Sequence, residues 1–254
     1  MGFLSGKKGL IVGIANDQSI AWGCAKHMRA AGAEIAVTYL NEKADRFVRP
    51  LAEQVEAAIY EPLNVSKPEE MEAVFKKIEK EWGKLDFVIH AIAFARLEDL
   101  HGRVIDCSAE GFAESMDISC HSFLRLAKHA EPLMTDGGSM ITLSYYGSEK
   151  VIDNYNVMGV AKAALEAGMR YAAAELGPKG ISVNAVSPGP LLTRAASGIA
   201  HFDDLMKYAI ENSPSGKLVT IDDVGQYATF LVSDAARHIT GNTLFVDGGL
   251  HIKG

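Results

Sequence analysis

The sequence has little of several features that would point to particular functions. It contains three cysteines, Cys24, Cys107 and Cys120, with no Cys-x-x-Cys spacing, which excludes a disulfide framework and a cysteine zinc site. The net charge is -7 and basic residues are scattered among acids, which argues against a nucleic-acid partner. No run of 18 apolar residues and no signal-peptide pattern occurs, so neither membrane spanning nor secretion is indicated. We therefore expect a cytoplasmic protein.

The eight histidines also lack ligand spacing with acids or cysteines, so we expect no metal site. The chain is, by contrast, rich in apolar residues. Its 254 residues are 48% hydrophobic and 22% charged, which suits one large domain with a sizeable core. No change in composition divides the chain. We expect a single domain over residues 1–254.

Short apolar runs alternate along the chain with segments of helical period. Parallel strands need crossover connections, so this order predicts a Rossmann-like, doubly wound α/β fold with helices on both faces of a parallel sheet. The predicted strands are 8–13, 34–39, 57–63, 85–91, 139–143, 181–186 and 243–246. The predicted helices are 19–31, 42–54, 66–82, 108–134 and 154–176. In such sheets ligands bind beyond the carboxyl ends of the strands.

The loop that follows the first predicted strand runs from Gly13 to Gly23 and leads into a helix that Ser19 is placed to cap. Ser66 is similarly placed before the helix that opens with Pro68. The N-terminus of the first helix would offer free amides and partial positive charge to a pyrophosphate. The loop lacks the middle glycine of the usual fingerprint, so a plain structural turn is the alternative.

The ends of the second, third and fourth strands bear on the choice of cofactor. Tyr39-Leu40 supplies no acid to read a ribose, and only Lys43 and Arg46 are within reach of a 2'-phosphate. We therefore favour NAD(H), with NADP(H) not excluded. Asn64-Val65 is placed either to clasp adenine or to form an ordinary Asn turn. The run 91–93 is either a passage for nicotinamide and ribose or a packed strand end.

Tyr155 and Lys162 are the main candidates for chemistry. They are seven positions apart, so on a helix both fall on one face with a rise of about 10 Å between them. The lysine stem leans toward the N-terminus and hence toward the phenol. An ammonium near a phenol favours the phenolate and makes the phenol a better proton donor. The alternative is a buried tyrosine with a lysine that reaches solvent.

Six motifs, in order and over almost the whole chain, carry a resemblance. They are Gly13–Gly23 with Ser19-Ile20-Ala21, His90–Ala95, Ser144–Gly147, Asn154–Lys162, Pro188-Gly189-Pro190 with Thr193, and Val246–Gly249. Together they resemble the bacterial NADH-dependent enoyl-acyl-carrier-protein reductases, a divergent branch of the short-chain dehydrogenase/reductase family. Six residues separate Tyr155 and Lys162, whereas common short-chain dehydrogenases have three between the catalytic pair. Gly159 stands where that spacing would place lysine.

The resemblance implies hydride transfer from NADH to the β-carbon of a trans-2-enoyl thioester on acyl carrier protein, in fatty acid biosynthesis, by a homotetramer. It makes Tyr155 the group that holds the enolate oxygen, Lys162 the contact to the nicotinamide ribose, and Tyr145 a second tyrosine at the reacting end. The implied cofactor-binding residues are Gly13, Ala15, Ser19, Ile20, Leu40, Asn64, Val65, Ile92, Lys162, Leu191 and Thr193. The implied substrate-binding residues are Ala95, Tyr145, Tyr155, Ala195, Ile199, Phe202 and Met206.

The resemblance also implies a substrate-binding lid at about 191–211, although apolar residues at helical spacing are usually core. Three positions depart from the family pattern: Leu40 for a polar residue, Asn64 for Asp, and Ala93 for Gly. Two other functions stay open. One is a carbonyl or alcohol dehydrogenase of the wider family, which the spacing of the tyrosine and lysine disfavours. The other is a dinucleotide-binding sensor without activity, which the presence of Tyr145, Tyr155 and Lys162 disfavours.

Overall fold

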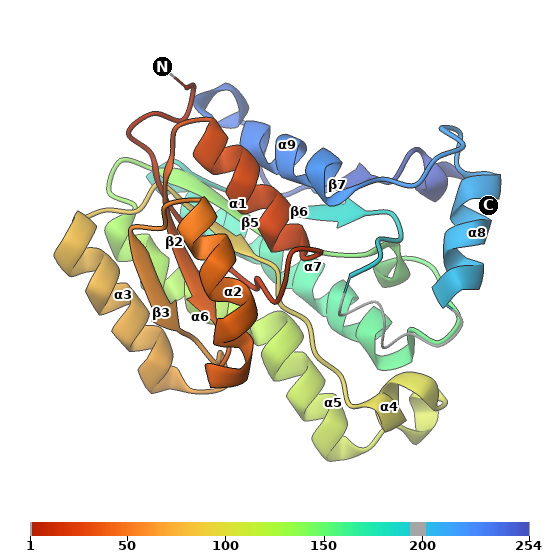
Figure 1. Ribbon diagram of the computed structural model, residues 1–254. Coiled ribbons are helices and arrows are strands. Elements are labelled where there is room, and N and C mark those ends of the chain that lie inside the picture. The colour runs from red at the N-terminus through yellow and green to blue at the C-terminus, as the bar shows by residue number, and fades with distance from the viewer. Residues whose placement is uncertain (1, 194–201, 254) are drawn as a thin grey trace.

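A seven-stranded parallel sheet forms the centre of the computed structural model, which describes residues 2–193 and 202–253 (Figure 1). The strand order is β3-β2-β1-β4-β5-β6-β7. The strands are β1 (Lys8–Val12), β2 (Glu34–Tyr39), β3 (Ile59–Pro62), β4 (Phe87–His90), β5 (Gly138–Leu143), β6 (Ile181–Pro188) and β7 (Thr243–Val246). The order reverses between β1 and β4, which places the binding crevice of a doubly wound sheet at their carboxyl ends.

Helices cover both faces of the sheet, as predicted, because the strands β1 to β6 present apolar side chains to both sides. One face is covered by α1 (Ile20–Ala30), α2 (Glu42–Gln54) and α9 (Ile221–Leu231). The other is covered by α3 (Pro68–Trp82), α6 (Ser122–Ala130) and α7 (Asn156–Leu176). Beyond the sheet lie α4 (Leu97–His101), α5 (Ala109–Met116) and α8 (Phe202–Asn212). Within the described ranges, no helix is both long and apolar enough to cross a membrane.

Short helical turns complete the chain. The 3-10 turns are Val104–Asp106, Glu131–Leu133, Tyr146–Ser148, Gly177–Lys179, Asp234–Ala236 and Leu250–Ile252. A π-helical turn, Asp117–His121, separates α5 from α6. The predicted helix 108–134 is confirmed as one continuous helical segment, but the π turn interrupts its α-helical hydrogen-bond pattern and a 3-10 turn ends it. Such π turns are frequent at functional sites.

Ser19 is the N-cap residue of α1, as predicted, but its side chain does not cap the helix, and the cap predicted at Ser66 is wrong. The Oγ atom of Ser19 makes no capping bond to α1 and instead accepts from the loop amides of Ala15 (3.0 Å) and Asn16 (3.1 Å). The N-cap of α3 is Lys67, one residue after Ser66, and Pro68 occupies the first helical position. The Ser19 side chain thus stabilises the conformation of the loop before α1.

The two glycines at the ends of this loop, Gly13 and Gly23, have different structural roles. Gly13 has φ +113°, and a Cβ there would lie 2.1 Å from the carbonyl oxygen of Ala91. The loop therefore passes directly over the end of β4. A Cβ on Gly23 would lie 2.2 Å from the carbonyl oxygen of Ile221, so this glycine allows α1 and α9 to pack closely. Only the first glycine of the pattern shapes the binding crevice.

Candidate active site

A cavity of about 330 Å³ lies beyond the carboxyl ends of β1, β4, β5 and β6. It extends from the N-terminus of α1 to the start of α7. Most of the predicted site residues line it, although they come from segments far apart in sequence. These are Gly13, Ala15, Ser19, Ile20, Ile92, Ala95, Tyr145, Tyr155, Lys162, Leu191, Thr193 and Phe202. The fold therefore brings the phosphate loop and the tyrosine–lysine pair to one place.

Other predicted site residues do not line this cavity. Leu40 is 53% exposed, and Asn64, Val65 and Met206 are not part of the cavity wall. Ala195 and Ile199 lie outside the described residues, as does most of the first half of the predicted lid. The assignments of these six positions stay predictions.

The two tyrosines pack against each other at the closed end of the cavity. Their ring centroids are 4.9 Å apart at an interplanar angle of 69°, an edge-to-face contact. Burial raises the pKa of both hydroxyls, and the pKa of Tyr155 is raised further by Tyr145 and Glu166. The expectation that Lys162 makes this phenol more acidic is wrong, because the effect of burial dominates the pKa of Tyr155. Tyr155 is therefore a protonated hydrogen-bond donor.

Lys162 is buried two turns further along α7 and points its Nζ atom under the cavity. That atom donates to the carbonyl oxygen of Leu143 at the end of β5, at 2.6 Å. Burial lowers the pKa of Lys162 to about 8, opposed by the charges of Glu166 and Cys120. An ammonium carries three hydrogens, so two remain for other acceptors after the bond to Leu143. At neutral pH the group is a cation able to donate into the cavity.

The packing of two glycines explains why the lysine is seven positions from Tyr155. A Cβ on Gly147 would lie 2.5 Å from the ring of Tyr155, and one on Gly159 would lie 2.8 Å from the carbonyl oxygen of Gly147. A lysine at position 159 would therefore push the chain at Gly147 off the tyrosine ring. Lys162, on the same helix, has a clear path instead.

The start of α1 suits a diphosphate. Its first turn carries no acid, whereas α2 and α3 each have two acids there. The first amides of a helix have no partner within the helix, and the dipole adds partial positive charge. Ile20 and Ala21 line the cavity at this point. The residues present therefore fit the diphosphate of a dinucleotide, and those at the tyrosine end fit its nicotinamide ribose.

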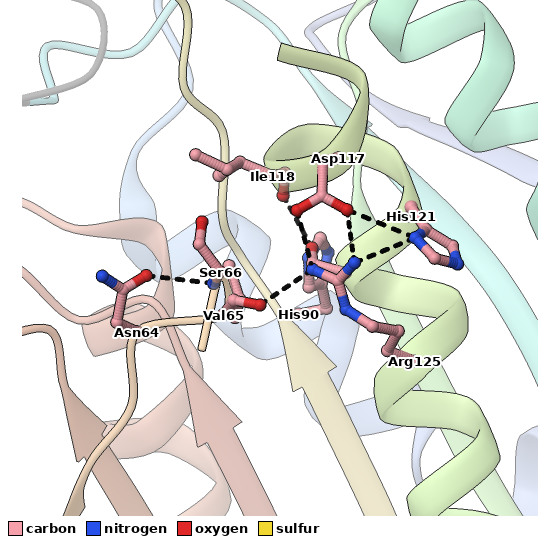
Figure 2. Close-up of polar contacts among 9 residues, drawn as sticks. Asn64, Val65, Ser66, His90, Asp117, Ile118, His121 and Arg125 are labelled. Carbon is pink, nitrogen blue, oxygen red and sulfur yellow. Dashed lines mark hydrogen bonds and ion pairs between the residues drawn. The ribbon is translucent and has the colours of Figure 1, made fainter. Parts of the chain in front are cut away.

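A polar network that sequence reasoning missed supports the segment after β3 (Figure 2). Arg125 on α6 donates through Nη2 to the carbonyl oxygen of Val65 at 2.8 Å. The same guanidinium pairs with Asp117 and donates to Nδ1 of His121. Asn64 accepts from the amide of Ser66 at 3.0 Å, which is the ordinary Asn turn that the sequence left open.

His90, at the end of β4, is a second residue that sequence reasoning missed. Its Nδ1 lies 2.8 Å from the hydroxyl of Thr142 and its Nε2 lies 2.8 Å from that of Ser122. Ser122 donates to the carbonyl oxygen of Ile118 at 2.6 Å, so His90 donates through Nε2 and accepts at Nδ1. Burial, aided by the charge of Lys162, lowers its pKa to about 3. His90 is therefore neutral.

Helical spacing was the available signal for some of these residues. Asp117, His121 and Arg125 follow one another at intervals of four, which places them on one helical face. Glu166 follows Lys162 by four residues and accepts from the hydroxyls of Ser144 and Ser148 beside Tyr145. His90 has no comparable signal, because its partners come from β5 and α6. Among the described residues no group of three potential metal ligands is present.

The fold and the cavity together define a nicotinamide-dependent oxidoreductase of the short-chain dehydrogenase/reductase class, with a tyrosine at the start of α7 and a lysine within that helix beside a diphosphate site. A family model described as enoyl-(acyl carrier protein) reductase matches residues 13–251. The chain belongs to the enoyl-acyl-carrier-protein reductase family. The resemblance drawn from the six motifs is thus confirmed.

Individual relatives agree over the full length. The chain is 48% identical over 253 residues to enoyl-acyl-carrier-protein reductase (NADH) 1 of Rhizobium meliloti, covering 100% of this chain and 93% of that one. A reductase from Anaplasma phagocytophilum, solved in complex with NAD, has 50% identity and a TM-score of 0.96, covering 100% and 97%. The Bacillus cereus reductase, solved with NADP+ and an indole naphthyridinone, has 43% identity and a TM-score of 0.98, covering 100% of both chains.

Proposed function

We propose that this chain is the NADH-dependent enoyl-acyl-carrier-protein reductase of fatty acid biosynthesis, acting on trans-2-enoyl thioesters. The observation that carries the proposal is the convergence of Tyr155 and Lys162 with the N-terminus of α1 on one cavity. The spacing of the pair, with glycine at position 159, favours this activity over carbonyl or alcohol dehydrogenation. The names of the relatives support the same activity and the same cofactor.

NADH, when bound, supplies the hydride that saturates the β-carbon of the thioester. Tyr155 donates its hydroxyl hydrogen to the thioester oxygen, where negative charge develops. Because the phenol is buried, this hydrogen bond acts in a site of low dielectric, and one such donor contributes about 3 kcal/mol to transition-state stabilisation. Lys162 holds the ribose hydroxyls and adds positive charge beneath the reacting atoms. Tyr145 restricts the ring of Tyr155 by edge-to-face packing.

The remaining site assignments belong to the same proposal. Leu40, Asn64 and Val65 hold the adenosine, with Val65 supported by Arg125. Residues 191–211 form a lid over the acyl chain, an assignment supported by Leu191, Thr193 and Phe202 on the cavity wall. Ala95, Ala195, Ile199 and Met206 complete the acyl site. Residues 1–254 form one domain, an assignment supported by the single sheet order that runs from β3 to β7.

The decisive measurement follows absorbance at the nicotinamide band with purified protein, NADH and crotonyl or longer enoyl thioesters on acyl carrier protein. We expect oxidation of NADH that depends on the enoyl substrate. Turnover on a 3-ketoacyl thioester together with none on any enoyl thioester would overturn the proposal and favour a carbonyl reductase. Binding of NADH without turnover on either substrate would favour the sensor.

We also propose that the protein is a homotetramer. A groove between α6 and α7 is lined by Leu124, Ala127 and Ala172, and beside them Tyr171 is 74% exposed. Exposed apolar residues on helices of a compact protein mark association surfaces. Light scattering after gel filtration should report four chains, and Tyr171→Glu should give smaller species. A monomeric wild-type protein at micromolar concentration would contradict this assignment.

We further propose that the protein works in the cytoplasm. The three cysteines are free thiols, which a reducing compartment preserves. Cell fractionation followed by immunodetection checks this assignment, and recovery in an extracellular or membrane fraction would contradict it.

A further inference from the structure

Asn156, the residue after Tyr155, joins the catalytic helix α7 to the short helix α4. Its side-chain Nδ2 donates to the carbonyl oxygen of Leu100 at 2.7 Å and also to that of Gly102. The last carbonyls of a helix have no partner within the helix. A carboxamide nitrogen carries two hydrogens, one for each of these carbonyls. Two facing acceptors also require the nitrogen, and not the oxygen, to point toward α4.

The backbone on either side of Tyr155 is strained. Asn154 has φ +60° and Asn156 has φ +30°, in the left-handed region that L-residues other than asparagine and aspartate rarely adopt. Such conformations persist where the surrounding structure holds them, and they gather at active sites. The two hydrogen bonds to α4 are contacts of this kind for Asn156. The position of Tyr155 is thus tied to that of α4.

Helix α4 is part of the cavity wall. Leu97 and Leu100 line the cavity, and the buried side chain of Leu100 packs with Tyr155 and Met158. The far side of the same segment is fixed by Asp99, whose carboxylate accepts from the amide and the hydroxyl of Ser108. Residues 97–108 are therefore attached at two points, to the start of α5 and to Asn156.

We propose that Asn156 is a positioning residue that holds α4 against Tyr155 and so sets where the thioester lies relative to the phenol. The inference rests on the proposed function, because it concerns the substrate side of that site. Asn156 itself is absent from the cavity wall, so it acts through Leu100 and Tyr155. Removing the two hydrogen bonds from Asn156 should raise the KM for the enoyl substrate. The KM for NADH should stay largely unchanged, because NADH is held from the other side of the cavity.

Two variants separate the side chain from the backbone. Asn156→Gly keeps access to positive φ and removes both hydrogen bonds. We expect the KM for the enoyl thioester to rise about 30-fold, which corresponds to about 2 kcal/mol for the two lost bonds, with the KM for NADH within about twofold of wild type. Hydrogen exchange of the amides in 97–106 should become about tenfold faster, with no change in β6.

Asn156→Asp keeps the shape but places a carboxylate against two carbonyl oxygens. Its KM for the enoyl thioester should exceed that of Asn156→Gly at pH 8 and fall toward it as acidification protonates the carboxyl and restores one donor. The Gly variant should show no such pH dependence beyond that of wild type. Asn242→Gly is the matched control, because Asn242 also donates from Nδ2 to a loop carbonyl but lies at the start of β7. It should leave exchange at 97–106 unchanged.

Unchanged hydrogen exchange of the amides in 97–106 in Asn156→Gly would refute the claim that Asn156 holds α4 in place. An equal rise in both KM values would overturn the positioning of the substrate and indicate a general structural role. If wild-type protein turned over no enoyl thioester, the proposed function would fail by itself. The exchange measurement would still decide whether Asn156 holds α4.

Discussion

The two ends of the proposed cofactor site are built in different ways. At the catalytic end, Tyr155 is the N-cap residue of α7, Lys162 lies within that helix, and both are buried. At the adenosine end, Val65 follows β3 and is held by a guanidinium from α6, while Leu40 is exposed after β2. The first arrangement depends on helical spacing and desolvation. The second depends on hydrogen bonds between separate elements.

This difference teaches where the site tolerates change. A buried donor has few substitutes, because removing it leaves a desolvated oxygen without a partner. A loop supported by a half-exposed charge network shares its support among several groups and with water. Substitutions at the catalytic end should therefore reduce activity or cofactor affinity more than substitutions at the adenosine end. The following predictions test that order, from the largest effect to the smallest.

Tyr155→Phe should give the largest loss, because it removes the hydroxyl that the proposed function assigns as the donor to the thioester oxygen. We expect kcat to fall by about 10²- to 10³-fold while the Kd for NADH stays within about twofold. Steady-state rates and fluorescence titration with NADH provide the two quantities. Tyr145→Phe is the matched control and should lower kcat much less. A similar loss in both variants would assign the proton-donating role to Tyr145 as well.

Lys162→Ala should weaken cofactor binding. Hydrogen bonds from a charged group contribute about 1.5–3 kcal/mol, so we expect the Kd for NADH to rise about 10- to 100-fold. In wild-type protein the pKa of Lys162 is about 8, so the ammonium is charged below that pH and loses its proton above it. Affinity for NADH should therefore decline as the pH rises through 8. Equal affinity for NADH in the variant and wild type would refute the ribose contact.

His90 lies beneath the site between β5 and α6 and should affect stability more than catalysis. It stays neutral in the folded protein because its pKa is about 3, while an unfolded histidine titrates near 6.5. Between these values the unfolded chain binds a proton that the folded protein does not, so acid destabilises the fold. From pH 7 to 5 this residue should lower the free energy of unfolding by about 2 kcal/mol.

Urea denaturation of wild type and His90→Gln at both pH values isolates that contribution. The variant should lose about 2 kcal/mol less than wild type between pH 7 and 5, because the other seven histidines are common to both chains. The same pH dependence in both proteins would show that His90 titrates normally in the folded state.

Arg125→Met should give the smallest effect, at the adenosine end. It removes the bond to Val65 and the partner of Asp117. One hydrogen bond of about 1 kcal/mol predicts a rise of about fivefold in the KM for NADH, with kcat unchanged. Arg125→Lys keeps the charge, and its KM for NADH should lie between those of wild type and Arg125→Met. A loss as large as that of Lys162→Ala would break the contrast between the two ends.

Parts of the fold and site were predictable because they rest on local pattern. The alternation of apolar strands and amphipathic helices predicted the doubly wound parallel sheet, and the structure confirms it. The predicted helix 154–176 is largely confirmed, but α7 begins at Asn156, so Tyr155 is its N-cap residue and not a member of the helix that carries Lys162. The π turn at Asp117–His121 was not predicted. Its Ser119 hydroxyl bonds to the backbone of Phe94, which is a contact between separate segments that no local pattern shows. The cap expected from Ser19 failed because its hydroxyl satisfies loop amides.

By itself the sequence determined the family and the order of the strands along the chain, because these follow from periodicity and motif order. It did not predict the helices α4, α8 and α9, and its choice of Tyr155 and Lys162 as the catalytic pair stays a prediction. Only the tertiary structure decided what surrounds that pair. The direction of the pKa shift at Tyr155 depends on burial by Leu100 and Tyr145, and the tie from Asn156 to α4 joins residues 56 positions apart. Desolvation and contacts of this kind arise when distant segments pack, which no local pattern records.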